Sequence, residues 1–234
     1  MPEPITIDSA RTAVMVVDMQ NDFCSVGGMF DRAGIDISTV QKAVAPTRGV
    51  LAAARKAGIS VIYLKMAFLP DLSDLGDDDS TNRARHLHFG VGQSSLAPDG
   101  RVGRFLIRET WNTDVIAELQ PEPDDLVLYK HRFSGFYQTE LDQILRKLEV
   151  KNLIFTGCTT SVCVDSTLRD AMFRDYRCVL LADCVGEPIG SNVARSNHEA
   201  SILVIQALFG WVAQSIPLIE ALEQHTRGDS VPRA

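Results

Sequence analysis

Three residues of this chain could do chemistry together: a cysteine, a carboxylate and a lysine, at Cys163, Asp18 and Lys130. Each stands at or shortly after the end of an apolar run that is typical of a buried strand. A thiol beside a base can attack a carbonyl carbon and form a covalent intermediate. In that chemistry Asp18 would take the thiol proton, and Lys130 would orient and stabilise the charged pair. The three residue types therefore indicate acyl transfer by a nucleophilic cysteine.

The turn around Cys163 suits a nucleophile. The apolar strand before it ends at Gly157, and the polar cluster 159–161, which can cap free N–H groups, precedes a predicted helix over 162–174. Cys163 then falls in the first helical turn, where the helix dipole and unpaired N–H groups favour a thiolate. The backbone N–H groups of Thr159 and Cys163 would form an oxyanion hole.

Each residue also has an ordinary structural interpretation. Asp18 fits a turn or a helix cap, and Lys130 fits a surface lysine whose stem lies on apolar neighbours. Cys163 fits a small buried apolar residue without chemistry. His131, beside Lys130, leaves a Cys-His arrangement as an alternative.

Apolar runs and helical spacing alternate along the chain and predict an α/β fold. The predicted strands are 13–17, 59–66, 126–129, 153–155, 177–182 and 211–213. The predicted helices are 38–57, 114–119, 139–148, 162–174, 197–208 and 216–224. Pro46 is expected to kink the first helix or to mark an earlier break. Such βαβ units build a doubly wound, mainly parallel sheet with helices on both faces, and neighbouring strand ends converge on one crevice.

Length and composition narrow the class of protein. The 234 residues suit one large domain, 1–234, because no linker divides the chain; the polar stretch 226–234 is predicted to be a flexible tail. A net charge of −7 argues against a nucleic-acid or anionic membrane partner, and no apolar run approaches a membrane span. Five cysteines without CxxC spacing suggest neither a disulfide framework nor a zinc ribbon. We therefore expect a reducing, cytoplasmic compartment.

The segment 69–108 is irregular and is predicted to be an insertion that serves as a lid or an oligomer contact. Its acidic residues are Asp71, Asp74 and the run 77–79. Together with His86 and His88 they raise the hypothesis of a metal site. The acidic run is more simply a solvated loop, and the two histidines lack partners at firm spacing, so no metal is predicted.

Separated motifs resemble those of the isochorismatase-like cysteine hydrolases. They are Asp-Met-Gln-Asn-Asp-Phe at 18–23, Lys130, and Thr-Thr-Ser-Val-Cys-Val at 159–164, and the resemblance spans roughly 7–222. It implies a parallel six-stranded sheet flanked by helices, with Asp18, Lys130 and Cys163 as the catalytic set. It also implies a cis peptide bond between Cys158 and Thr159, and assembly as a homodimer or homotetramer.

Within the family, the segments 130–137, 166–170 and 209–212 look most like ureidoacrylate amidohydrolases, which cleave a carbamoyl group from a ureido acid. Phe23 and Phe133 stand where that branch tends to have tyrosine, which would alter hydrogen bonding to the substrate. Nicotinamidases of the superfamily carry a metal-binding Asp/His cluster. Here the segment 65–68 reads Lys-Met-Ala-Phe, so no metal or other cofactor is expected.

The sequence thus predicts a metal-independent hydrolase that cleaves a C–N bond of a ureido, carbamoyl or amide small molecule through a thioester at Cys163. The carbonyl would lie near the Thr159 N–H. The candidate pocket walls are Phe23, Phe68, Trp111, Phe133 and Tyr137. Biuret or an N-carbamoyl amine is an alternative substrate. Other readings are vinyl-ether hydrolysis of the isochorismate type, against which the cysteine counts, and a non-catalytic oligomeric binding protein.

Overall fold

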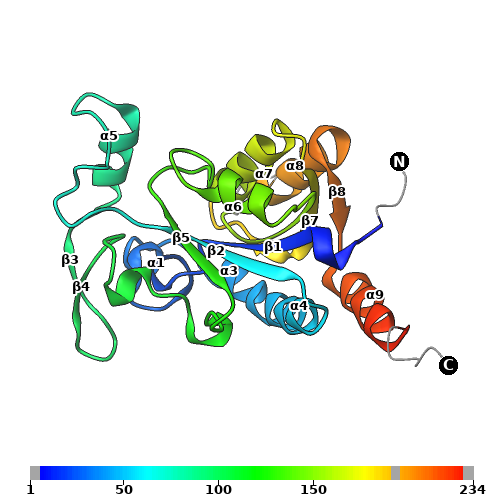
Figure 1. The fold of residues 1–234 in the computed structure, drawn as a ribbon. Coiled ribbons are helices and arrows are strands. Elements are labelled where there is room, and N and C mark those ends of the chain that lie inside the picture. The colour runs from blue at the N-terminus through cyan, green and yellow to red at the C-terminus, as the bar shows by residue number, and fades with distance from the viewer. Residues whose placement is uncertain (1–5, 191–195, 229–234) are drawn as a thin grey trace.

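The computed structural model describes residues 6–190 and 196–228. A six-stranded parallel sheet forms its centre, in the order β5-β2-β1-β6-β7-β8 (Figure 1). The strands are β1 Thr12–Val17, β2 Ser60–Met66, β5 Leu126–Lys130, β6 Asn152–Cys158, β7 Arg177–Gly186 and β8 Trp211–Ala213. The predicted doubly wound sheet is therefore confirmed. Its strand order reverses between β1 and β6, which is where such sheets open a crevice at their carboxyl edge.

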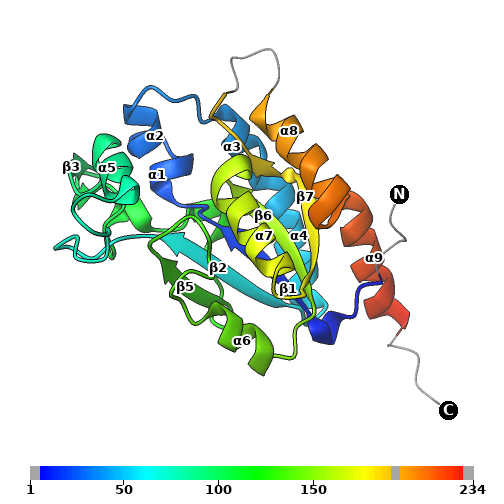
Figure 2. The ribbon, with the colours of Figure 1, turned by 90° about the horizontal axis from the view of Figure 1, so that it is seen from above.

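Helices cover both faces of the sheet. The helices with α geometry are α1 Asn21–Cys24, α2 Met29–Arg32, α3 Ser38–Lys42, α4 Val44–Lys56, α5 Thr81–His88, α6 Leu141–Lys147, α7 Asp165–Met172, α8 Asn197–Val204 and α9 Ser215–Gly228. In Figures 1 and 2, α3, α4 and α9 lie on one face, and α6, α7 and α8 lie on the other. The strands β1 and β6 are buried along their whole length, so apolar side chains pack on both faces.

Tight turns and π segments complete the chain. The 3-10 turns are Ser9–Arg11, Trp111–Thr113 and Ala117–Leu119. Thr160–Val164 precedes α7 and Ile205–Phe209 follows α8 as π-helical segments. The predicted tail does not begin at 226, because α9 continues to Gly228; 229–234 lie outside the described residues.

Two predicted helices differ in the structure. The helix over 38–57 breaks at Ala43, which ends α3 and begins α4, and Pro46 lies in the first turn of α4, where its missing N–H costs nothing. The helix over 114–119 is instead a bridge and a 3-10 turn. Its backbone is already bonded elsewhere: Asn21 N donates to Asp114 O, and Ile116 N donates to Met19 O.

The insertion 69–108 has structure of its own. It contains α5 and the antiparallel hairpin of β3 Ser94–Leu96 and β4 Val102–Arg104, and it extends beyond the sheet beside α1 and α2 (Figures 1 and 2). The buried carboxylate of Asp22 holds it, accepting from Leu106 N at 2.7 Å and from Met29 N at 3.0 Å. In the described ranges no helix has the length and apolar character needed to cross a membrane.

Candidate active site

Strand order brings the three predicted catalytic residues together. Asp18 follows β1 and Cys163 follows β6, the two central strands at the reversal point. Lys130 ends β5, two strands away, and its side chain passes over Met66 of β2, with Nζ 3.5 Å from the Met66 sulfur. Asp18 leaves its strand with a positive φ of 54° and accepts from Met66 N through Oδ1 at 2.9 Å. All three side chains therefore meet at the carboxyl edge of the sheet.

Asp18 and Lys130 form a buried ion pair. Lys130 Nζ lies 2.8 Å from Asp18 Oδ2, and neither side chain is more than 1% exposed. Lys130 also donates to Arg132 O at 3.3 Å. Burial raises the pKa of Asp18, although the charge of Lys130 counteracts it. Burial opposes protonation of Lys130, but the charges and hydrogen bonds of Asp18 and Cys163 together outweigh it and raise the pKa of Lys130, so the ammonium persists.

Cys163 is a buried thiol beside this pair, 6% exposed. Its pKa is raised because burial disfavours the thiolate and the charge of Asp18 adds to that effect, whereas the charge of Lys130 counteracts it. This corrects the expectation that the helix start favours a thiolate. The positive charge nearest the sulfur is already neutralised by Asp18, and the dipole of one short turn does not offset burial. The resting residue is a thiol whose proton must leave during attack.

The backbone before Cys163 is tightly constrained. Gly157 has a φ of +116°, and a Cβ there would stand 2.0 Å from Val17 O, so the close approach of β6 to β1 requires glycine. The bond between Cys158 and Thr159 is cis, as the family resemblance implies. Thr159 lines the cavity, and its N–H has no hydrogen-bond partner among the described residues.

The turn is held from β7 rather than by its own hydroxyls. The predicted capping by threonine or serine is absent from this helix start, since the Thr159 side chain makes no capping hydrogen bond. Instead Ser161 N donates to Glu187 Oε2 at 2.7 Å, and Ile189 N donates to Glu187 Oε1 at 2.9 Å. Glu187 is 3% exposed. It therefore ties the nucleophile turn to the loop after β7.

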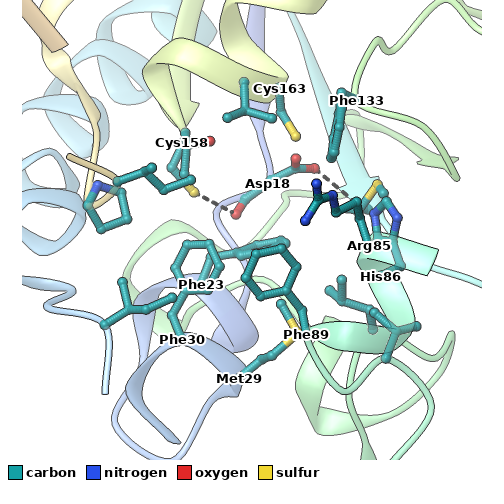
Figure 3. Close-up of a pocket in the computed structure, with 18 residues that line it drawn as sticks. Asp18, Phe23, Met29, Phe30, Arg85, His86, Phe89, Phe133, Cys158 and Cys163 are labelled. Atoms are coloured by element: carbon teal, nitrogen blue, oxygen red, sulfur yellow. Dashed lines mark hydrogen bonds between the residues drawn. The ribbon is translucent and has the colours of Figure 1, made fainter. Parts of the chain in front are cut away.

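A cavity of about 510 Å³ opens in front of these residues (Figure 3). Its walls are mainly apolar and include Phe23, Met29, Phe30, Phe89, Leu106, Phe133 and Ile189. Its polar and thiol-bearing residues are Asp18, Arg85, His86, Cys158, Thr159 and Cys163. The cavity thus combines an apolar interior with a nucleophile and a few polar groups, as small-molecule sites do.

Two of the five predicted wall residues line this cavity. Phe23 comes from α1, and Phe133 comes from the segment after β5. Phe68 does not line it, which corrects that prediction. It is fully buried and packs behind His86, with 5.0 Å between the ring centroids.

The other two predicted wall residues lie outside the cavity lining. Trp111 stands in a 3-10 turn, where its carbonyl accepts from Asn21 Nδ2 at 2.8 Å. Tyr137 is 44% exposed and packs under the Arg132 guanidinium, 5.3 Å from the ring centroid. Spacing along the chain could not separate these rings from true wall residues, because the cavity wall is assembled from distant segments.

Sequence reasoning missed the polar side of the cavity. Arg85 of α5 and Phe89, which caps the C-terminus of that helix, are four residues apart and both line the cavity, a spacing that the sequence contained. The sequence suggested His86 only as a possible metal ligand. Its Nδ1 lies 2.7 Å from Asn82 O, a carbonyl that can only accept, and burial lowers its pKa, so the ring is neutral. Within residues 6–190 and 196–228, no three His, Cys, Asp or Glu side chains come together in a cluster that could hold a metal ion.

The fold resembles that of solved enzymes, a cysteine hydrolase and an amidase among them. A cysteine hydrolase from Pseudomonas syringae pv. phaseolicola 1448A is 31% identical, with a TM-score of 0.79 over 96% of this chain and 99% of that chain. N-carbamoylsarcosine amidase from Thermoplasma acidophilum is 27% identical, with a TM-score of 0.64 over 88% of this chain and 96% of the other.

Residues 12–216 match the family model of the isochorismatase domain, and the chain belongs to the isochorismatase family. The ureidoacrylate amidohydrolase RutB of Variovorax paradoxus (strain S110) is 38% identical over 91% of this chain and 81% of its own length. RutB of Serratia proteamaculans (strain 568) is 39% identical over 91% and 83%. The predicted family and its cysteine-hydrolase character are thereby confirmed.

Proposed function

We propose that this chain hydrolyses a C–N bond of a ureido or carbamoyl small molecule through a covalent thioester at Cys163. Its class, hydrolases of carbon–nitrogen bonds other than peptide bonds, is supported directly by the ureidoacrylate amidohydrolases among its relatives. The single observation that carries the catalytic roles is the buried Asp18–Lys130 pair, 2.8 Å long, beside the Cys163 thiol at the end of an apolar cavity.

The first half-reaction forms the thioester. Asp18, whose pKa is raised, takes the thiol proton as the sulfur of Cys163 attacks the carbonyl carbon. The carbonyl oxygen becomes an oxyanion beside the free N–H of Thr159, with the N–H of Cys163 as the proposed second donor. Asp18 then returns the proton to the leaving nitrogen, the C–N bond breaks and the amine departs. Lys130 remains an ammonium throughout and stabilises each anion that forms.

The second half-reaction releases the acyl group. Water loses a proton to Asp18 and attacks the thioester carbon. The C–S bond then breaks, and the proton passes to the sulfur, which restores the thiol of Cys163. With a ureido acid the acyl group is a carbamoyl group, so the product is carbamic acid, which decomposes to ammonia and carbon dioxide. The buried setting of Cys163 and Asp18 excludes bulk water from their charges and strengthens each interaction.

The insertion 69–108 is proposed as a lid over this cavity. Arg85 and His86 of α5 and the adjoining Phe89 contribute to the wall, so the segment completes the site rather than lying apart from it. Phe133 and His86 pack against one another with 5.5 Å between ring centroids, which joins the lid to the segment that follows Lys130.

We also propose a cytoplasmic homodimer or homotetramer. All five cysteines are free, which fits a reducing compartment. Large apolar side chains are exposed near α7, α8 and α9: Phe173 is 66% exposed, Leu208 71% and Ile216 66%. A second copy that covered them would bury this surface. Light scattering of the purified chain measures its mass in solution and tests the assembly directly.

The test of function is ammonia release from a panel: ureidoacrylate, biuret, N-carbamoyl amino acids, an N-carbamoyl amine and nicotinamide. Wild type is compared with Cys163→Ser and with the matched control Cys178→Ser. The Cys178 sulfur is buried away from the cavity and faces the carbonyls of Leu168 and Tyr176, which a hydroxyl can also satisfy. We expect release from a ureido compound that is lost in Cys163→Ser and kept in Cys178→Ser.

Trapping the intermediate gives an independent measurement. Rapid quenching with acid should yield a protein whose mass has increased by one carbamoyl group, located on the peptide that contains Cys163. Silence across the whole panel, together with unmodified protein, would leave the non-catalytic binding protein as the better interpretation. Release from biuret alone would keep the mechanism and change the substrate.

A further inference from the structure

The ionisable side chains that line the cavity leave one unbalanced charge. Apart from the thiols of Cys158 and Cys163, whose raised pKa keeps them neutral, they are Asp18, Arg85 and His86. Asp18 is paired with Lys130, and the low pKa of His86 keeps that ring neutral. Within the described ranges the Arg85 side chain makes neither an ion pair nor a hydrogen bond, and only its backbone carbonyl accepts one, from Phe89 N. The cavity therefore presents a positive charge that no carboxylate of the described chain neutralises.

The helix α5 places the Arg85 side chain at the cavity. Ser80 caps its N-terminus, where the side chain accepts from Arg83 N, and Arg85 lies one turn before Phe89, the residue that caps its C-terminus. Arg83, two residues earlier, is bound to Asp78 at 3.3 Å and does not line the cavity. Figure 3 shows the Arg85 side chain directed into the cavity, between Asp18 and the ring of His86 in that view.

We propose that Arg85 is the anion-binding residue of this site and selects substrates that carry a carboxylate as well as the scissile carbonyl. A guanidinium offers a planar fork of N–H donors that matches a carboxylate with two parallel hydrogen bonds. Lys130 cannot serve, because its charge is committed to Asp18 in the buried pair. The apolar wall of Phe89 and Phe133 would contact the carbon chain between the two polar ends. This assignment rests on the proposed function and narrows it to ureido acids.

Binding to an inactive protein tests the assignment apart from turnover. The probes are N-carbamoyl-β-alanine and its carboxamide, which have nearly the same size and shape but differ in charge. They are titrated by calorimetry into Cys163→Ser, with and without Arg85→Met. Hydrogen bonds to charged groups contribute about 1.5–3 kcal/mol, so the acid should bind roughly 10-fold or more tighter than the carboxamide. Arg85→Met should abolish that preference and leave affinity for the carboxamide unchanged.

Two further variants sharpen the result. Arg101→Met removes the same charge from an exposed arginine that is paired with Asp99 and does not line the cavity, so it should keep the preference. Arg85→Lys keeps the charge without the fork and should retain part of it. Because the Arg85 side chain has no ion-pair or hydrogen-bond partner within the described chain, Arg85→Met should have the same melting temperature as its parent protein. That result would show that a lost preference for the acid comes from a lost contact and not from a lost fold.

Turnover in the active protein separates the two proposals. With Arg85→Met, KM for N-carbamoyl-β-alanine should rise roughly 10-fold or more while kcat changes little, if binding of the carboxylate is uniform along the reaction. Equal binding of acid and carboxamide, or an acid affinity that Arg85→Met leaves intact, would overturn the role of Arg85. If the acid binds through Arg85 but no panel compound releases ammonia, the anion site stands and the hydrolase proposal fails.

Discussion

Replacing Lys130 by methionine should greatly lower the free energy of unfolding, and the size of that loss should depend on pH. Lys130 and Asp18 are both at most 1% exposed and lie 2.8 Å apart. At that separation and an effective dielectric constant of about 20, their attraction is about 6 kcal/mol. Removing one member of a buried pair costs about 3–5 kcal/mol, because the other charge stays buried without a partner. We expect a loss of that size in the free energy of unfolding at pH 7.

The pH dependence follows from the stranded carboxyl group. Burial already raises the pKa of Asp18, and loss of the ammonium raises it further. A group whose folded pKa exceeds its unfolded value stabilises the protein fully below the unfolded pKa, and that stability is lost as pH rises through the folded pKa. Lys130→Met should therefore lose less stability at pH 5 than at pH 8.

The assay is urea unfolding followed by circular dichroism for wild type, Lys130→Met, Asp18→Asn and the double variant. If the pair acts as a unit, the double variant should be at least about 2 kcal/mol more stable than the sum of the single losses predicts. Arg146→Met is the matched control: it breaks an exposed pair with Asp142 and should cost less than about 1 kcal/mol. Additive losses in the cycle, or a Lys130→Met loss no larger than the control, would refute the reasoning.

Three further predictions concern other positions. Burial raises the pKa of Asp22 from 3.8 to about 7, so stability should fall by up to about 4 kcal/mol as pH rises from 4 to 7; Asp22→Asn should flatten that slope in urea titrations, and an unchanged slope would contradict it. Gly157→Ala places a Cβ 2.0 Å from Val17 O at a φ of +116°, so calorimetry should show a large loss in the free energy of unfolding. A loss below about 1 kcal/mol would contradict the inferred steric clash. Cys163 has a raised pKa, so its alkylation by iodoacetamide should accelerate through and beyond pH 8.5, whereas a plateau near pH 7 would indicate a preformed thiolate.

Much of the framework could be predicted from local sequence. The strand that ends at Val17 and the strand before Gly157 are continuous apolar runs, and such runs are buried on both faces whatever surrounds them. The helical spacing of apolar residues likewise predicted α4 and α7, because it too depends only on neighbouring residues. The helix predicted over 114–119 was wrong, because its backbone groups pair with the segment after β1, and such pairing between distant segments leaves no periodic trace.

The candidate site divides in the same way. Asp18, Lys130 and Cys163 could be chosen from the sequence because each stands at or just after the end of a predicted buried strand, and parallel sheets form their sites at the carboxyl ends of strands. Of the predicted aromatic walls, only Phe23 and Phe133 line the cavity. A buried aromatic and a cavity-lining aromatic look alike in sequence, since both are large apolar residues flanked by others.

The parallel α/β framework and the candidate reactive residues at its strand ends could be predicted from local sequence, because strand and helix periodicity are properties of neighbouring residues. The burial, charge pairing and protonation of those residues depend instead on tertiary contacts. The charge of Lys130 is paired with Asp18 in a buried contact, and burial raises the pKa of Cys163, which therefore remains a thiol. The same folding leaves Arg85 as the unpaired cation of the cavity among the described residues. Charge pairing and burial depend on distances between segments far apart in the chain, and those distances exist only once the sheet and its insertion have packed.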